Sequence, residues 1–274
     1  MRYYIADCHF YHKNLLTEMD NRGFESVEQM NEVMIEKWNK KVHARDEVVI
    51  LGDLSLGNGE ETNKILSRLK GRLCLIRGNH DERYLKDKDF DASRFEWIKD
   101  YAEIHDNKRK IVLMHYPIFC YNGQFRRGAD GTPLSYMLHG HIHKTADQEL
   151  VDRFVRETRA TMRKSAHQDE AMPVPCQMIN CFCMYSNYTP LTLEEWVECD
   201  KRRIYRDTEK QNGVNMSSVL RILLKDEIEK EKKQAEFETL SNAAVNVAKN
   251  MGISIEQAMA TITSAKISAS DSKN

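Results

Sequence analysis

Short apolar runs alternate with helical patterns over the first 120 residues of the chain. Apolar runs at residues 2–6, 47–51 and 73–77 predict strands. Between them, residues 26–42 and 61–71 carry apolar positions at helical spacing and predict two helices. The order strand, helix, strand, helix, strand predicts a parallel sheet covered by helices, and hence an α/β fold.

The pattern changes along the rest of the chain. The later predicted elements are two strands in residues 101–114 around a turn at Asp106 and Asn107, a short strand at 136–138, a helix at 147–164 and a late strand at 173–185. Beyond about residue 200 the composition becomes a long charged helical pattern. We therefore expect a first domain at residues 1–200, with a helical insertion at about 146–171, and a helical C-terminal extension at 201–274 whose last residues are disordered.

Composition narrows the classes of function. The chain is 41% hydrophobic and 30% charged with a formal net charge of −1, so no general attraction to nucleic acid or to an anionic membrane is expected. No apolar run approaches the roughly 18 residues that span a bilayer. The N-terminus is too short and too polar for a signal peptide. Seven irregularly spaced cysteines favour reduced thiols and a cytoplasmic protein without a membrane partner.

Polar residues follow five predicted strands at the point where each strand ends. In chain order these residues are Asp7, Cys8 and His9; Gly52 and Asp53; Gly78, Asn79, His80 and Asp81; His115, Tyr116 and Pro117; and His139, Gly140, His141, Ile142 and His143. The carboxyl ends of parallel strands form the ligand-binding edge of an open sheet. We therefore expect these groups to converge although they lie far apart in sequence.

The residue types restrict the chemistry of that edge. Carboxylate, amide and imidazole groups suit Mn, Fe, Zn and similar divalent ions. Their number exceeds the needs of one ion, and a shared carboxylate can bridge two ions roughly 3.5–4 Å apart, an arrangement used for in-line attack on phosphorus. A single one of the five motifs can occur by chance at the end of a strand in many unrelated chains. Their occurrence in order, each after a strand pattern, is what indicates a functional site.

The motif order D-x-H, G-D, G-N-H-D, H and G-H-x-H resembles the calcineurin-like metallophosphoesterase superfamily, over roughly residues 1–195. The segments "HYP" and "NYTPLTLEE" are also similar to small bacterial and phage members. The resemblance implies an α/β fold in which a sandwich of two mixed sheets is flanked by helices. It also implies that residues 1–200 form a metallophosphoesterase catalytic domain.

The same resemblance implies roles for individual residues. The first metal ion would be held by Asp7, His9, Asp53 and His143, and the second by Asp53, Asn79, His115 and His141, with Asp53 as the bridge. The ions would be Mn²⁺, Fe²⁺, Zn²⁺ or Ni²⁺, with Mn²⁺ favoured in vitro, and a bridging hydroxide would attack phosphorus. His80 would act near the leaving group as general acid or charge stabiliser, with Asp81 orienting its ring. His139 has no metal role and is expected beside a ligand or in packing.

Two departures from the family pattern argue against a Ser/Thr protein phosphatase. The second motif is "GDLSLG" rather than G-D-x-x-D-R-G, and Asp81 stands where those enzymes have Glu. Tyr11 replaces a glycine of many members. The neighbouring His12 and Asn14 are candidate substrate contacts, with a local capping role as the alternative.

A basic helix face offers a candidate contact for a polyanion. The predicted helix at 147–164 carries Arg153, Arg156, Arg159 and Arg163 on one face, and the preceding loop adds Arg126 and Arg127. Such a surface beside two metal ions would guide a nucleotide or nucleic acid. The alternative is a solvated face balanced by Glu149, Asp152 and Glu157. The expected substrate is a phosphorylated small molecule, nucleotide or nucleic acid, most naturally a phosphodiester.

Two further alternatives stay open. Some members of this fold have lost catalysis, so the runner-up to a metal-dependent phosphoesterase is a metal-binding scaffold that serves as an interaction module; the presence of every ligand position and of His80 favours the enzyme. The helices beyond residue 200, with Leu220, Leu223 and Leu224, serve packing or oligomerisation. The segment holding Cys176, Cys181 and Cys183 is expected to carry buried free thiols rather than zinc.

Overall fold

The computed structural model describes residues 1–164 and 170–212, together with positions 245, 249 and 254. The chain divides into two units, Met1–Tyr205 and Arg206–Asn274. The first unit holds all the strands described below. The predicted charged helix, the helix after Ser254 and the C-terminal tail lie outside the described residues.

Two four-stranded sheets form the first unit. The first sheet has the order β1 (Arg2–Ile5), β2 (Glu47–Ile50), β3 (Arg72–Ile76) and β4 (Phe95–Lys99), and its strands are parallel. The second has the order β10 (Met178–Asn180), β7 (Ser135–His139), β6 (Arg109–Met114) and β5 (Tyr101–Asp106). In it, β10, β7 and β6 are parallel and β5 is antiparallel. The structure thus has the expected two-sheet α/β fold; the second sheet is mixed, whereas the first is parallel throughout.

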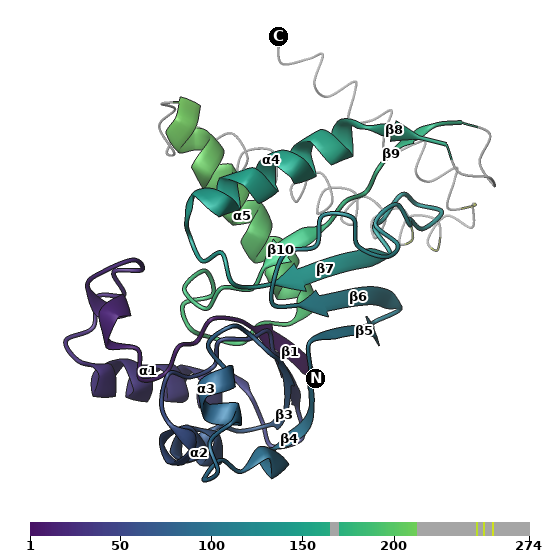
Figure 1. Cartoon of the computed structure of the whole chain (residues 1–274). Coiled ribbons are helices and arrows are strands. Elements are labelled where there is room, and N and C mark those ends of the chain that lie inside the picture. The colour runs from purple at the N-terminus through teal and green to yellow at the C-terminus, as the bar shows by residue number, and fades with distance from the viewer. Residues whose placement is uncertain (165–169, 213–244, 246–248, 250–253, 255–274) are drawn as a thin grey trace. The chain divides into compact units, whose positions relative to one another are not determined.

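Helices cover the outer faces of both sheets (Figure 1). Helices α1 (Val27–Lys41) and α2 (Gly59–Arg68) pack on the first sheet, and α4 (Ala146–Ala160) packs on the second. Successive residues of a strand point to opposite faces, so Tyr3 faces the core beneath α1 while Tyr4 faces the core between the sheets. The strands β1, β2 and β3 are therefore buried on both sides, and functional side chains can reach solvent only near the strand ends.

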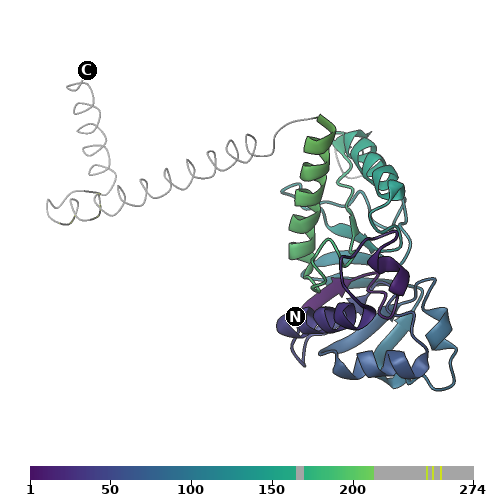
Figure 2. The same cartoon turned by 90° about the vertical axis from the view of Figure 1, so that its left-hand side faces the viewer.

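Helix α5 (Leu193–Asn212) ties the two sheets together. The Trp196 indole N–H donates to the Tyr4 carbonyl at 2.8 Å, and the Arg203 guanidinium pairs with Asp152 on α4 at 2.6 Å. Figure 2 shows α4 and α5 next to each other. The remaining elements are short: η1 (Lys13–Leu16), α3 (Glu82–Leu85), η2 (Ala92–Arg94), β8 (Met162–Arg163) and β9 (Met172–Pro173). Among the described helices, none has the length and apolarity of a membrane span.

Helix α4 is shorter than its sequence pattern predicts. It ends at Ala160 instead of continuing to residue 164, and Arg163 lies in β8, which pairs with β9. The Thr161 hydroxyl donates to the Glu157 carbonyl at 3.0 Å, while the Thr161 backbone is extended. A threonine that bonds a nearby carbonyl competes with the helical ladder. The four arginines therefore do not share one helix face.

The strand β4 was not predicted from the sequence. It lies at the edge of the first sheet and buries only Phe95 fully. An edge strand needs less apolar surface than a central one, so its periodic signal is weak. The predicted turn at Asp106 and Asn107 is confirmed between the antiparallel strands β5 and β6.

Candidate metal centre

The carboxyl ends of β1, β2, β3, β6 and β7 bring the predicted ligands together. Five of these residues have left-handed backbone: φ is 55° at Asp7, 51° at His9, 54° at Asp53, 71° at His141 and 44° at His143. Residues other than glycine rarely adopt this conformation, and it costs of order 1–3 kcal/mol at each position. Strain concentrated at these strand ends, where the chain turns toward one point, is typical of a functional site.

Two glycines let the backbone lie against the carboxylates. A Cβ atom on Gly78 would overlap the Asp53 carboxylate, and one on Gly140 would lie 2.6 Å from an Asp7 carboxylate oxygen. Neither glycine has a positive φ. These motif glycines are therefore required by close approach to the two acids rather than by a left-handed turn.

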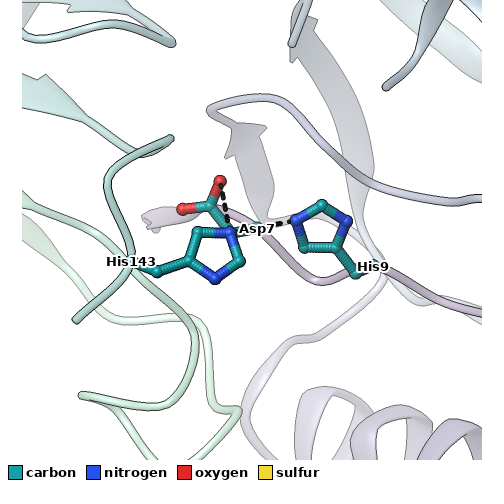
Figure 3. Close-up of side chains that lie close together, drawn as sticks. All are labelled: Asp7, His9 and His143. Atoms are coloured by element: carbon teal, nitrogen blue, oxygen red, sulfur yellow. Dashed lines mark hydrogen bonds and ion pairs between the residues drawn. The ribbon is translucent and has the colours of Figure 1, made fainter. Parts of the chain in front are cut away.

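The first group of candidate ligands is Asp7, His9 and His143, shown in Figure 3. All three are buried. Each offers one ligand atom, and these atoms lie within 4.8 Å of one another. His9 Nε2 is 3.1 Å from His143 Nε2 and 3.6 Å from an Asp53 carboxylate oxygen, and His143 Nε2 is 3.8 Å from an Asp7 oxygen.

The hydrogen bonds of this group fit a bound cation. His143 Nδ1 donates to the Asp20 carboxylate at 2.7 Å, which leaves a lone pair on its Nε2. Burial and the neighbouring His143 hold the pKa of His9 well below its usual value, so His9 is neutral. These two imidazoles, whose Nε2 atoms lie 3.1 Å apart beside two carboxylates, provide the nitrogen and oxygen donors that a divalent transition ion prefers.

The second group lies on the other side of Asp53. Asp7, Asp53 and His115 again offer ligand atoms within 4.8 Å of one another. The Asn79 side-chain oxygen is 3.0 Å from His115 Nε2 and 2.9 Å from His141 Nδ1. Asn79 and His141 are exposed, whereas the other members are buried. All seven residues expected as ligands thus meet in one cluster, and this side of it is open to solvent.

Burial and neighbouring charges shift the pKa values of three residues in this cluster. Burial raises the pKa of Asp7 to about 6. Burial would also raise the pKa of Asp53, but the hydrogen bond and charge of His115 lower it instead. Although burial opposes the charge of His115, Asp53 and Asp7 raise its pKa to about 9. The opposite pKa shifts of Asp53 and His115 show that these two side chains interact directly.

His80 lies at the rim of this cluster. Its backbone N–H donates to Asp53 at 2.8 Å, and its Nε2 is 4.0 Å from the other Asp53 oxygen. The side chain is 45% exposed, which leaves its ring accessible to a substrate.

Asp81 has different partners from those expected. Its buried carboxylate accepts hydrogen bonds from the backbone N–H groups of Asp53, Leu54 and Gly78 and from the Tyr84 hydroxyl. In the described part of the chain, no hydrogen bond or ion pair joins the Asp81 carboxylate to the His80 ring. The expectation that Asp81 orients His80 is thus replaced by a structural role, because its oxygens fasten the second and third motifs to each other.

Sequence reasoning missed Asp20 and Arg22. The Asp20 carboxylate is 2% exposed and joins His143 to Arg22, whose guanidinium pairs with it at 2.9 Å. Arg22 also donates to the carbonyls of Asp7 and Cys8 at 3.0 and 2.7 Å. These residues follow no strand and match no periodic pattern, so only the fold brings them under the first motif.

Two candidate substrate contacts near the first motif also lie close to the rim. The His12 ring is 5.2 Å from the His9 ring and 6.2 Å from the His80 ring, measured between centroids. His12 precedes η1 without a side-chain capping bond, so the capping alternative is not supported for it. Asn14 is exposed within η1. Tyr116, which follows His115 and for which no role was predicted, places its 39% exposed ring 4.5 Å from that of His141.

The arginines expected beside the metal centre lie at the opposite end of the second sheet. Helix α4 begins just after His143 and runs back along the strands, as Figure 1 shows. Near its end, Arg159 donates to the Cys176 carbonyl at 2.7 Å, just before β10 begins, and Arg156 is one turn away from that end.

The loop arginines share that location. Arg127 pairs with Pro133 just before the start of β7, and Arg163 stacks over Phe125 at 4.3 Å. The expected position of Arg126, Arg127 and Arg156 beside the metal centre is therefore wrong. For Arg156, the physical reason is that a helix following a strand leaves the strand's carboxyl end after its first turn. For Arg126 and Arg127, it is that their loop returns to the start of β7.

The first histidine of the "HGHIH" run, His139, is not among the candidate ligands. His139 is fully buried, its Nδ1 donates to the Gly140 carbonyl at 3.0 Å, and burial lowers its pKa to about 4. It serves as a neutral packing residue under the centre. Cys176, Cys181 and Cys183 are buried free thiols, as expected.

Comparisons with known proteins indicate the family of the chain. The family model of the calcineurin-like phosphoesterase superfamily domain matches residues 4–158 of this chain. The chain is 31% identical over 179 residues to the uncharacterized protein MJ1445 of Methanocaldococcus jannaschii, covering 65% of this chain and 88% of that protein. It is 28% identical over 166 residues to the Gene 66 protein of Mycobacterium phage L5, covering 52% of this chain and 76% of that protein.

Two solved structures are similar at lower identity. A protein of unknown function, AQ665 from Aquifex aeolicus, is 22% identical with a TM-score of 0.47, covering 71% of this chain and 96% of that one. A single mutant of Vps29 from Entamoeba histolytica is 15% identical with a TM-score of 0.27, covering 64% of this chain and 73% of that one.

Proposed function

Because the chain belongs to the calcineurin-like phosphoesterase superfamily, we propose that it is a dinuclear-metal phosphoesterase that hydrolyses a phosphodiester or nucleotide-type substrate. The observation that carries the proposal is that seven residues with oxygen or nitrogen ligand atoms meet in one cluster, with Asp53 between its two groups. The accessible His80 lies at the rim of this cluster. Mn²⁺ is the ion that we expect to support activity in vitro.

The chain's own residues would divide the work as follows. Asp7, His9 and His143 would hold one ion and Asn79, His115 and His141 would hold the other, and Asp53 lies between the two groups. Two divalent ions supply a nucleophile at neutral pH and neutralise charge on the phosphate.

His80 is placed to move a proton. Its ring nitrogen gives a proton to the departing oxygen, and its backbone bond to Asp53 fixes its position relative to the centre. The His80 side chain is 45% exposed, so its ring can contact the substrate directly.

The direct test is an assay of the full chain, stripped of metal and then loaded separately with Mn²⁺, Fe²⁺, Zn²⁺ or Ni²⁺. Hydrolysis of bis(p-nitrophenyl) phosphate is expected with at least one ion and not with the stripped protein. Absence of hydrolysis with all four ions, despite bound metal, would favour the non-catalytic metal-binding scaffold.

Metal loading is also expected to stabilise the fold. An ion that binds only the folded state at 100 times its dissociation constant adds about 2.7 kcal/mol to the free energy of unfolding. Thermal unfolding of the full chain should therefore shift to higher temperature in Mn²⁺ than in chelator. Identical unfolding temperatures would contradict a metal centre built from these buried donors.

Replacement of Asp20 by asparagine should weaken the binding of one metal ion and leave the binding of the other unchanged. The Asp20 carboxylate fixes the His143 tautomer that leaves Nε2 free for the ion, and loss of such a partner typically costs 10–100-fold in metal affinity. Titration with Mn²⁺ followed by calorimetry should show one weakened site and one unchanged site. Asp130→Asn, in an exposed loop, is the control. Two unchanged sites in a folded Asp20→Asn variant would refute this role.

A further inference from the structure

An open pocket lies beside His80. Its volume is about 550 Å³, and it is lined by Leu56, Asn79, His80, Glu82, Arg83 and Lys86. Asn79 and His80 also belong to the candidate metal centre, so the pocket and the centre share a wall. The other lining residues come from α3 and from the segment after the second motif.

One cationic residue of this pocket, Arg83, has no ion-pair partner among the described residues. Glu82 and Lys86 form an ion pair with each other across one turn. The exposed Arg83 guanidinium has no hydrogen bond or ion pair with any other residue of the described ranges. Asp87, which interacts electrostatically with Arg83, uses its carboxylate to accept the backbone N–H groups of Gly59 and Asp89. Arg83 is thus available for an anion that enters the pocket.

The position of His80 fixes which part of a substrate occupies the pocket. If His80 protonates the departing oxygen, the leaving group must lie on the His80 side of the scissile phosphate. The pocket on that side has an apolar wall at Leu56 and a cationic group at Arg83, three residues beyond His80. A guanidinium presents a planar fork of donors that matches the oxygens of a phosphate.

We propose that this pocket binds the leaving group and that Arg83 binds a second phosphate carried by it. The inference rests on the proposed function, and it narrows the substrate class to diesters whose leaving group is itself phosphorylated, such as a nucleotide. It also replaces the distant α4 arginines, because Arg83 lines a pocket that His80 and Asn79 share with the centre.

The experiment compares three phosphodiesters with the Mn²⁺-loaded full chain. They are bis(p-nitrophenyl) phosphate, a dinucleoside monophosphate, and the same dinucleoside with a terminal phosphate on the nucleoside that product analysis identifies as the leaving group. The terminal phosphate should raise kcat/KM about tenfold, through KM, because Arg83 binds it equally in the ground and transition states. The gain should shrink as salt screens this exposed pair.

Variants assign the gain to Arg83. Arg83→Gln should abolish the gain that the terminal phosphate gives, and Arg83→Lys should restore part of it. Lys88→Gln removes one charge from the same segment outside the pocket lining and should keep the full gain. A gain that survives in Arg83→Gln, or no gain in the wild type, overturns this inference alone. Absence of hydrolysis of all three diesters overturns the proposed function as well.

Discussion

Replacement of Asp53 by asparagine is expected to lower kcat on bis(p-nitrophenyl) phosphate by at least about 10³-fold. Asp53 is 2% exposed, and its Oδ2 lies 3.6 Å from His9 Nε2 and 3.5 Å from His115 Nε2, so it faces both groups of ligands. Asparagine keeps the shape and the oxygen that accepts the His80 N–H, but it removes the charge that both ions would share. A loss of about 4 kcal/mol in transition-state stabilisation corresponds to this factor.

The measurement pairs steady-state rates with the metal content of the purified variant. We expect both to fall in Asp53→Asn and neither to fall in the control Asp130→Asn. An active Asp53→Asn variant with two ions bound would contradict the bridging position. A variant that loses activity with its metal content and fold intact would assign Asp53 a role in the reaction other than holding the ions.

Replacement of His80 by alanine is expected to lower kcat by about 10²–10⁴-fold, the usual contribution of a positioned general acid. The metal content should stay unchanged, because the His80 ring is 45% exposed and lies 4.0 Å from Asp53 at the rim of the centre. The loss should be smaller for a p-nitrophenyl ester than for an alkyl ester, since nitrophenolate departs without a proton.

The leaving-group comparison separates the two roles considered for His80. An equal loss on both esters would indicate that the ring stabilises charge on the phosphate and gives no proton to the leaving oxygen. A loss of bound metal in the folded variant would indicate that His80 holds an ion. Thermal unfolding of His80→Ala in chelator serves as the check on folding.

Asp20 and Asp81 show why buried acids needed the structure for their roles. Asp81 follows His80 directly in sequence, yet its carboxylate accepts three backbone N–H groups and the Tyr84 hydroxyl. Asp20 lies 123 residues from His143 and still bonds its ring. Distance along the chain predicts neither the partners of Asp81 nor the bond between Asp20 and His143. The direction of a side chain depends on the backbone conformation at its own position and on the packing around it.

The sequence alone determined which strands end in metal-ligating residues. Apolar runs set β1, β2, β3, β6 and β7, and the parallel order of these strands brings their carboxyl ends to one edge. Those local patterns were sufficient to predict an α/β fold and the convergence of the polar strand ends, because strand burial and strand direction follow from short-range signals. The two-sheet sandwich and the set of seven candidate ligands were implied by the resemblance to a known family.

Only the tertiary structure decided what surrounds those donors. The direction of α4 carries Arg156 away from the centre, whereas the turn after β3 puts Arg83 into the pocket beside His80. Asp20 and Arg22 support His143 and the first motif from a loop with no periodic pattern. These placements depend on packing between segments distant in sequence. Residue types and spacings therefore predict the candidate ligands of this protein, while its fold decides which residues support them and which residues line the pocket beside His80.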